Sequence, residues 1–246
     1  MSAVDMNHWN WHEHLMSPSF TPLKAQKSGN RERIIEAAIE LMNRKGSNIG
    51  TAQIAEHTSI SPGNIYYHFD NFSEIALEVV QRLRDELMEN LVLPSFGPVS
   101  AAQLVDYYVG GAAVLWRYRF VVSASRELAS RSAELENLFQ TFTDEGIASV
   151  RKILENLFAN YPGKLPVDGA LCSRLAENMW VLWSAWPRHV ETRRTQDGPT
   201  PKGIATGLQQ IALTVTPYID ADFYRQVEDG LVDYVTSLED RFLKAE

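Results

Sequence analysis

The spacing of apolar residues along the chain most constrains its fold. From Asn30 onward, apolar residues recur three or four positions apart, the period of one face of an α-helix. In the segment 34–42, Ile34, Ala38 and Leu41 fall on one stripe, and most charged residues fall on the other side. Runs that alternate apolar and polar residues between turn signals, the pattern of β-strands, do not occur in the sequence. We therefore expect an all-α protein.

Helix caps and helix breakers predict three short helices after the first thirty residues or so. Gly46 ends the first helix, and Thr51 caps the second. Ser61 caps the third, over 61–68, and Pro62 takes its first position, where a missing backbone N–H costs nothing. Because the second and third helices are joined by a tight turn, we expect a helix-turn-helix unit.

The rest of the chain predicts a larger helical part. Helical spacing continues in seven segments broken by Pro and Gly, namely 73–93, 100–121, 123–131, 133–160, 168–186, 203–216 and 221–243. The segment 187–202, which is rich in Pro and Gly, is expected to be a loop. We divide the chain into a flexible tail at 1–28, a three-helix domain at 29–72 and a larger helical domain at 73–246.

Composition and missing motifs exclude several classes of protein. The single cysteine, Cys172, excludes an intramolecular disulfide and fits a reducing compartment. The chain has no run of 18 apolar residues, and its first 23 residues lack the basic and apolar parts of a secretory signal. Motifs of phosphate loops, dinucleotide sites, serine hydrolases and zinc proteases are also missing. We therefore expect a cytoplasmic protein that is no enzyme and has no cofactor or membrane contact.

The charge distribution restricts nucleic-acid contacts to one short segment. The chain has 23 Lys and Arg residues against 31 Asp and Glu residues, a net charge of −8. Residues 24–72 hold six basic and five acidic residues, whereas 1–23 and 73–246 are both net negative. A DNA-binding surface must therefore be local.

The run ISPGNIYYHFDN at 60–71 is the most specific motif in the chain. It combines a helix cap, a helix start and a cluster of aromatic residues and histidine at fixed offsets. Together with the apolar pattern of 34–41, Gly46 and the segment 54–56, it resembles the DNA-binding domain of the tetracycline-repressor (TetR/AcrR) family of bacterial regulators. The resemblance covers 31–72 closely. The remaining chain matches the family only in its helical character and length.

The resemblance implies that the helix 61–68 lies in the major groove of DNA. It also implies that Tyr66 and His68 contact DNA. From the residues themselves, Asn64 can pair with adenine, and Thr51 can bind a phosphate at a helix N-terminus. The full set of expected DNA-binding residues is Thr51, Gln53, Ser61, Pro62, Gly63, Asn64, Tyr66, Tyr67 and His68. The alternative is that Tyr66 and Tyr67 only pack inside a small helical domain.

Two residues depart from the family pattern. Ser59 stands in the turn where the family usually has glycine, which causes strain if the backbone there is left-handed. Phe72 stands where the family usually has a lysine that approaches a phosphate, so we expect one contact with the DNA backbone to be lost.

The larger domain is expected to bind a small molecule. Gly110 and Gly111 are adjacent in a helical segment, where each glycine costs stability, so we expect space for a ligand beside them. We expect an apolar or aromatic inducer, and Arg117, Arg119 and Arg126 leave open an anionic group on it. The expected lining residues are Tyr108, Gly111, Trp116, Phe139, Phe142, Trp180 and Trp183. The alternative is that these aromatic residues are plain core.

Two helical segments carry more apolar surface than one neighbouring helix can cover. These are 171–186 and 223–242, and the family resemblance implies a two-fold dimer built on such helices. The expected dimer residues are Leu175, Leu182, Trp186, Val227, Leu231 and Leu238. The alternative is a large monomeric core.

The segment 8–14 holds three histidines and one glutamate, a composition that can bind a metal ion. We interpret it as part of the flexible tail and assign no metal site.

The predicted function is that of a homodimeric, sequence-specific DNA-binding transcriptional regulator. We expect a repressor on a near-palindromic operator in double-stranded DNA, released by a small inducer that binds in 73–246. One alternative is a regulator of the same fold that binds other proteins and has weak or lost DNA binding. An enzyme on a helical scaffold is a further alternative, without motif support.

Overall fold

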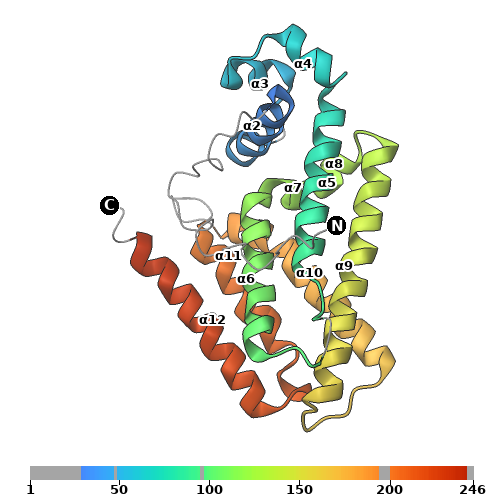
Figure 1. Cartoon of the computed structure of the whole chain (residues 1–246), viewed down its shortest axis with the longest axis vertical. Coiled ribbons are helices and arrows are strands. Elements are labelled where there is room, and N and C mark those ends of the chain that lie inside the picture. Colours follow the sequence, from blue (N-terminus) through green and yellow to red (C-terminus); the bar gives the residue numbers. More distant parts are fainter. Residues whose placement is uncertain (1–28, 47–48, 95–96, 194–199, 243–246) are drawn as a thin grey trace, which may run out of the picture.

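The computed structural model describes residues 29–46, 49–94, 97–193 and 200–242. Within these ranges the chain forms α-helices, one short 3₁₀ helix and no β-strand (Figure 1). The elements are α2 (Asn30–Lys45), α3 (Thr51–Thr58), α4 (Pro62–His68), α5 (Phe72–Asn90), α6 (Ala101–Arg117), α7 (Arg119–Ser123), α8 (Ser125–Ala129), α9 (Ala133–Asn160), α10 (Gly169–Thr192), α11 (Pro201–Leu213), η1 (Thr216–Tyr218) and α12 (Ala221–Phe242). The predicted all-α fold class is confirmed.

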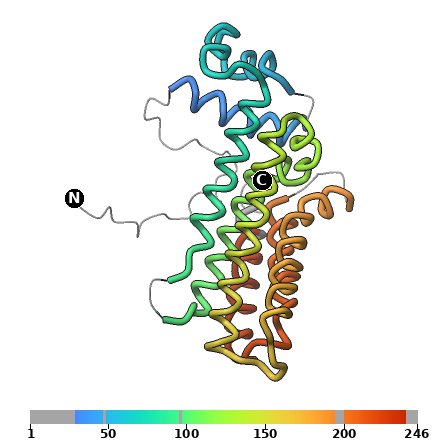
Figure 2. The backbone as a smooth tube through the Cα atoms, turned by 90° about the vertical axis from the view of Figure 1, so that its right-hand side faces the viewer, coloured from blue at the N-terminus to red at the C-terminus, as the bar shows by residue number. Residues whose placement is uncertain are grey.

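Helices α2, α3 and α4 form a small unit, here called the head, at one end of the elongated molecule (Figures 1 and 2). Each helix contributes a fully buried isoleucine to its core, namely Ile34, Ile54 and Ile65. Gly46 ends α2 and Ser61 caps α4 as predicted. The prediction that Thr51 caps α3 is wrong, because Gly50 is the N-cap and Thr51 is the first helical residue. The helix-turn-helix unit itself is confirmed.

The remaining helices, α5 to α12, are here called the body. α5 starts beside α4 and runs down into the body, where it packs against α6 and α9 (Figure 2). α10 packs against α9 and α11, and α12 packs against α6 and α11. Buried leucines such as Leu83, Leu115 and Leu135 fill the space between these helices. No helix in the described ranges is both long enough and apolar enough to span a membrane.

The prediction of a loop over 187–202 is wrong at both ends. α10 continues through Pro187 to Thr192, and α11 begins at Pro201, while 194–199 lie outside the described residues. The last turns of α10 pack on α11, where the indole nitrogen of Trp186 donates to the Gly203 oxygen at 2.8 Å. We infer that this packing outweighs the roughly 3 kcal/mol that a proline costs inside a helix.

Smaller differences concern the ends of other helices. α5 begins at Phe72, one residue earlier than predicted, and ends at Asn90. The segment 100–121 was predicted as one helix, but the structure divides it at Tyr118 into α6 and the start of α7. The shorter helix predicted near 123–131 corresponds to α8.

Polar contacts join the head to the body. Arg82 of α5 donates two hydrogen bonds, each 2.7 Å long, to the carboxylate of Glu32 in α2. Arg117, the last residue of α6, donates to Glu36 of α2 at 2.7 Å. Asn43 of α2 donates to the backbone oxygen of Arg117 at 2.6 Å. These contacts link the head to α5 and α6 in this structure.

Candidate nucleic-acid interface and ligand cavity

Two adjacent residues fix the start of α4. The Ser61 hydroxyl accepts a hydrogen bond from the backbone N–H of Asn64 at 3.3 Å, and Pro62 occupies the first helical position. Ile65 and Phe69 are 0% and 3% exposed, and they anchor one side of this segment in the head. The opposite side of α4 faces outward at the end of the molecule (Figure 1).

Two tyrosines dominate this outer side. The side chains of Tyr66 and Tyr67 are 54% and 84% exposed, so the alternative that they pack inside the domain is wrong. The Tyr66 hydroxyl lies 3.3 Å from the Thr51 hydroxyl at the start of α3. The Tyr67 ring meets the His68 ring edge-on, with 5.1 Å between centroids. Hydroxyl groups exposed in this way are suited to bind phosphate and sugar oxygens.

Gly63 lies in the first turn of α4 and is also exposed. A Cβ atom at this position would meet no other atom within 4 Å, and the φ angle is not positive. Neither packing nor backbone conformation therefore requires glycine here. A glycine that the fold does not need lets another molecule approach the helix backbone closely.

Asn64 and Gln53 are held by contacts inside the head. The Asn30 side chain donates from Nδ2 to Oδ1 of Asn64 at 3.3 Å, which links Asn64 to the start of α2. Gln53 Oε1 accepts from the backbone N–H of Gly50 at 3.0 Å and so helps to cap α3. An adenine contact through both amide atoms of Asn64 requires Oδ1 to accept a second hydrogen bond, which its two lone pairs permit.

The turn between α3 and α4 has a left-handed backbone. Ser59 has φ 55° and ψ 28°, and no other non-glycine residue in the described ranges has a positive φ. The Thr58 hydroxyl stabilises the turn by donating to the Ile54 oxygen at 2.7 Å and accepting from the Ile60 N–H at 3.3 Å. A left-handed backbone costs a non-glycine residue about 1–2 kcal/mol, so the strain predicted at Ser59 is confirmed.

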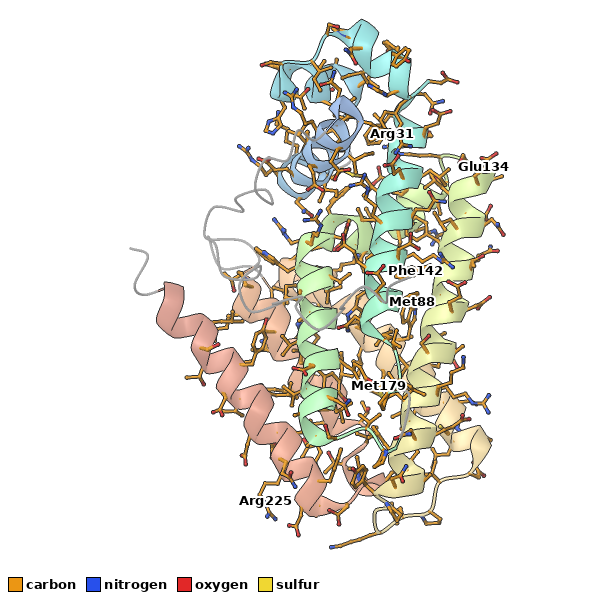
Figure 3. All side chains as sticks on the ribbon, viewed as in Figure 1. Arg31, Met88, Glu134, Phe142, Met179 and Arg225 are labelled. Carbon is orange, nitrogen blue, oxygen red and sulfur yellow. The ribbon has the colours of Figure 1, made fainter. Side chains whose placement is uncertain are left out.

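Two residues near α4 make contacts with parts of the body. Arg31 forms an ion pair with Glu78 of α5, and its guanidinium lies 5.0 Å from the centre of the Phe69 ring (Figure 3). The half-buried ring of Phe72 lies 5.2 Å from the guanidinium of Arg131, which follows α8. Phe72 therefore joins the start of α5 to the segment that follows α8, a role that the sequence did not indicate.

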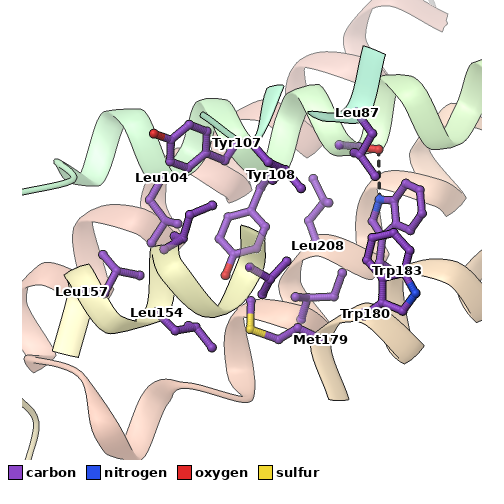
Figure 4. A pocket seen from close by; sticks show the side chains of 15 residues that line it. Leu87, Leu104, Tyr107, Tyr108, Leu154, Leu157, Met179, Trp180, Trp183 and Leu208 are labelled. Carbon is purple, nitrogen blue, oxygen red and sulfur yellow. Dashed lines mark hydrogen bonds between the residues drawn. The ribbon is translucent and has the colours of Figure 1, made fainter. Parts of the chain in front are cut away.

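A cavity of about 70 Å³ lies in the body (Figure 4). Its lining comes from five helices and consists of Leu87, Leu91, Leu104, Tyr107, Tyr108, Gly111, Val150, Ile153, Leu154, Leu157, Met179, Trp180, Trp183, Leu208 and Ile211. Four of the expected residues, Tyr108, Gly111, Trp180 and Trp183, are among them. Leu87 and Leu91 were not expected in the lining, although the apolar stripe of α5 could have indicated them.

Three expected lining residues do not reach the cavity. Trp116, Phe139 and Phe142 are not part of its wall. Phe142 instead supports the wall from behind, since its ring packs edge-on against Trp180 with 5.1 Å between centroids. Trp116 lies outside the cavity under the guanidinium of Arg119, 4.0 Å away.

The lining contains no charged side chain, so an arginine that binds an anionic group in this cavity is not found. Arg117 is engaged by Glu36, and Arg119 lies over Trp116. Arg126 belongs to α8 and is exposed.

The two adjacent glycines serve different purposes. A Cβ atom on Gly110 would lie 1.9 Å from Oδ1 of Asn90, so glycine is required there by the contact between α5 and α6. Asn90 in turn donates to the Tyr107 oxygen at 2.9 Å. Gly111 alone faces the cavity, and its oxygen accepts a hydrogen bond from the Trp183 indole at 3.1 Å. The prediction that both glycines open space for a ligand is therefore wrong for Gly110.

Most residues expected at a dimer interface lie in the core of one chain. The exposed fractions are at most 6% for the four buried ones, which are Leu175, Val227, Leu231 and Leu238. The apolar surface attributed to them is covered by neighbouring helices, so the reason for assigning them to an interface is wrong. Leu182 and Trp186, both in α10, are half-buried. Val181, which precedes Leu182 in the same helix, is 55% exposed and was not among the expected dimer residues.

No group of three or more His, Cys, Asp or Glu side chains that could hold a metal ion occurs in the described ranges. The His-rich segment 8–14 lies in the tail 1–28, outside the described residues.

Comparison with protein families gives two matches. The model of "Bacterial regulatory proteins, tetR family" matches residues 34–79. The model of a "Bacterial transcriptional repressor" matches residues 82–227. None of the curated proteins compared with the chain matches it.

Solved structures show the same fold. A TetR-family transcriptional regulator from Marinobacter aquaeolei is 27% identical, with a TM-score of 0.74 over 84% of this chain and 99% of that one. A regulator from Saccharomonospora viridis in complex with choline is 17% identical, with a TM-score of 0.60 over 78% and 98%. The ketosteroid regulator KstR2 of Mycobacterium tuberculosis is 16% identical, with a TM-score of 0.57 over 79% and 97%. Because the family models together match the head and most of the body, the chain belongs to the TetR family of bacterial transcriptional regulators.

Proposed function

We propose that the outer side of α4 binds one half-site of an operator in the major groove and that the protein is a repressor. One observation carries this proposal: Tyr66 and Tyr67 are exposed beside Gly63, a glycine that the fold does not require. Ser61 and Pro62 are exposed on the same end of the helix. In this arrangement the helix backbone can approach the base edges while the tyrosine hydroxyls bind the DNA backbone.

The charges of the head favour contacts other than ion pairs. Arg31 is paired with Glu78, Arg44 with Glu40, and Arg33 donates to the Thr58 oxygen at 2.7 Å. Binding that depends on hydroxyls and backbone groups releases few counterions, so we expect a shallow dependence of DNA affinity on salt.

We propose that a ligand in the body cavity releases the protein from DNA. α5 connects the two sites, because its first residue, Phe72, lies close to α4 and Leu87 and Leu91 line the cavity. α6 offers a second connection, because Tyr108 lines the cavity and Arg117 at its end binds α2. A ligand can act only by binding more tightly to the conformation whose heads do not fit DNA.

We further propose that two copies bind together, since one short recognition helix contacts only one half-site. The exposed side of α10 is our candidate for the contact. Val181 is 55% exposed there, Ala185 is exposed one turn later, and Leu182 is half-buried beside them.

In vitro selection tests DNA binding without knowledge of the operator. Wild-type protein is mixed with a library of random duplexes, and bound DNA is amplified over several rounds. We expect near-palindromic duplexes whose half-site centres lie roughly 34–36 Å apart. A variant with Tyr66→Ala and Tyr67→Ala should enrich no sequence. Tyr218→Ala is the matched control, because that half-buried tyrosine lies far from the head, in η1.

If wild-type protein enriches no sequence even at low salt, DNA binding by α4 is refuted. The same result favours the alternative of a TetR-fold regulator that binds other proteins. Release is tested afterwards on the selected duplex.

A further inference from the structure

The polar groups of the body cavity are few, and most are already paired. The Tyr107 hydroxyl donates to the Val92 oxygen at 2.6 Å, outside the cavity. The Trp183 indole donates to the Gly111 oxygen at 3.1 Å. In Figure 4 the indole nitrogen of Trp180 lies on the side of its ring that is remote from Tyr108. The remaining polar side-chain group is the hydroxyl of Tyr108.

Tyr108 is only 8% exposed, and its ring lies among the residues that line the cavity. Figure 4 shows its hydroxyl inside the cavity, directed toward the side of Met179. No hydrogen bond joins this hydroxyl to another residue in the described part of the chain. Its oxygen is not one of the fully enclosed side-chain atoms that lack a partner, so a small molecule in the cavity can reach it. Hydroxyl groups inside a protein normally have a hydrogen-bond partner, which a bound molecule would supply here.

The surroundings decide which form of the hydroxyl is present. Burial raises the pKa of Tyr108, so the phenol stays protonated and can donate a hydrogen bond. The rest of the lining is hydrocarbon, aromatic ring or thioether. A charged ligand group would lose its hydration there without gaining an opposite charge, which is strongly unfavourable.

We propose that the cavity binds an uncharged, mainly hydrocarbon molecule whose single acceptor oxygen, such as a ketone oxygen, is bound by Tyr108. Tyr108 is then the residue that determines specificity. The volume of about 70 Å³ is far below the roughly 300 Å³ of the smallest pockets for drug-sized ligands, so the part of the ligand held here is small unless the walls move. This inference rests on the proposed ligand site in the body.

Three probes of similar size test the inference, namely cyclohexanone, methylenecyclohexane and cyclopentanecarboxylate. Their dissociation constants are measured by NMR titration of the full-length protein. Tyr108→Phe should weaken cyclohexanone binding about tenfold and leave methylenecyclohexane binding within about twofold, because only the ketone accepts the hydrogen bond. Tyr218→Phe is the matched control, because this tyrosine lies in η1 and does not line the cavity, and it should change neither. The carboxylate should not bind.

Thermal unfolding without any probe gives a second, independent readout. Tyr107→Phe removes the bond to the Val92 oxygen and should lower Tm by about 2–4 °C. Tyr108→Phe should not lower Tm, because its hydroxyl has no partner to lose.

Several results would overturn the inference. One is that Tyr108→Phe weakens the binding of cyclohexanone and of methylenecyclohexane equally, and another is that it leaves cyclohexanone binding unchanged. The inference also fails if wild type does not bind cyclohexanone, or if it binds the carboxylate more tightly than cyclohexanone. A drop in Tm for Tyr108→Phe as large as for Tyr107→Phe would also contradict it. Failure of the proposed repressor function is a different result: the probes bind as expected, but the protein binds no operator or is not released by cyclohexanone.

Discussion

Replacing Gly63 with alanine should make the protein more stable and its DNA binding weaker. A Cβ atom at position 63 meets no atom within 4 Å, so the added methyl group causes no clash in the free protein. Alanine is better than glycine inside a helix by about 0.8–1.0 kcal/mol, and we expect about half of this in the first turn of α4. The free energy of unfolding should therefore rise by about 0.5 kcal/mol and Tm by about 1–2 °C.

The same methyl group should interfere with DNA. If the α4 backbone lies against the groove at Gly63, an extra methyl group overpacks the contact, at a cost of about 1–3 kcal/mol. This corresponds to DNA affinity that is roughly 5- to 150-fold weaker. Stability is measured by urea unfolding, and affinity by fluorescence anisotropy on a duplex obtained by selection.

Gly169→Ala is the matched control. Gly169 is the first residue of α10, a Cβ atom there also meets nothing within 4 Å, and it lies in the body. It should not lose DNA affinity. If Gly63→Ala folds and binds DNA as tightly as wild type, the backbone of α4 is not in close contact with DNA.

Three further changes test other parts of the structure. Ser59→Gly should relieve the left-handed strain and raise the free energy of unfolding by about 1 kcal/mol in urea titrations; a decrease would show that the serine is not strained. Burial raises the pKa of Glu86, so its charged form lowers stability above that pKa, and Glu86→Gln should be more stable than wild type at about pH 8. This advantage should shrink as the pH falls through the raised pKa, and a less stable variant at about pH 8 would contradict the sign. Wild type should have about twice the chain mass of 27.8 kDa by light scattering, whereas Val181→Glu should give monomers and Val92→Glu, on an exposed site outside α10, should not. Monomeric wild type would exclude the dimer.

The parts of the fold that could be predicted depend on local signals. Ser61 and Pro62 start α4 with contacts that span only three residues, so the sequence alone indicates the helix. The left-handed turn at Ser59 follows in the same way from its neighbours. The exposure of Tyr66 and Tyr67 follows from the burial of Ile65 and Phe69 on the other side.

The parts that could not be predicted depend on contacts between distant segments. Gly110 is required by the Asn90 side chain, which comes from a different helix. Leu231 is buried because α12 packs closely on α6, where a Cβ atom on Gly230 would lie 2.8 Å from Val105. The sequence shows the same apolar residues in α12 whether a second chain or α6 covers them, so it cannot distinguish a dimer interface from a core. Likewise Pro187 marks a helix end by itself, and only the packing of α10 on α11 keeps the helix intact.

The most direct test of the central claim places a DNA-cleaving group on the head. Ala52 is an exposed residue in the first turn of α3, and Cys172 is buried and is the single cysteine of the chain. In a Cys172→Ala background, Ala52→Cys carries an iron chelate that cuts nearby DNA, and Gly169→Cys carries it on the body as the control. Cuts from position 52 at each half-site of the selected duplex, with none from position 169, are the predicted result. No cuts from position 52 on a duplex that the labelled protein binds, or cuts from position 169, would show that another surface binds DNA.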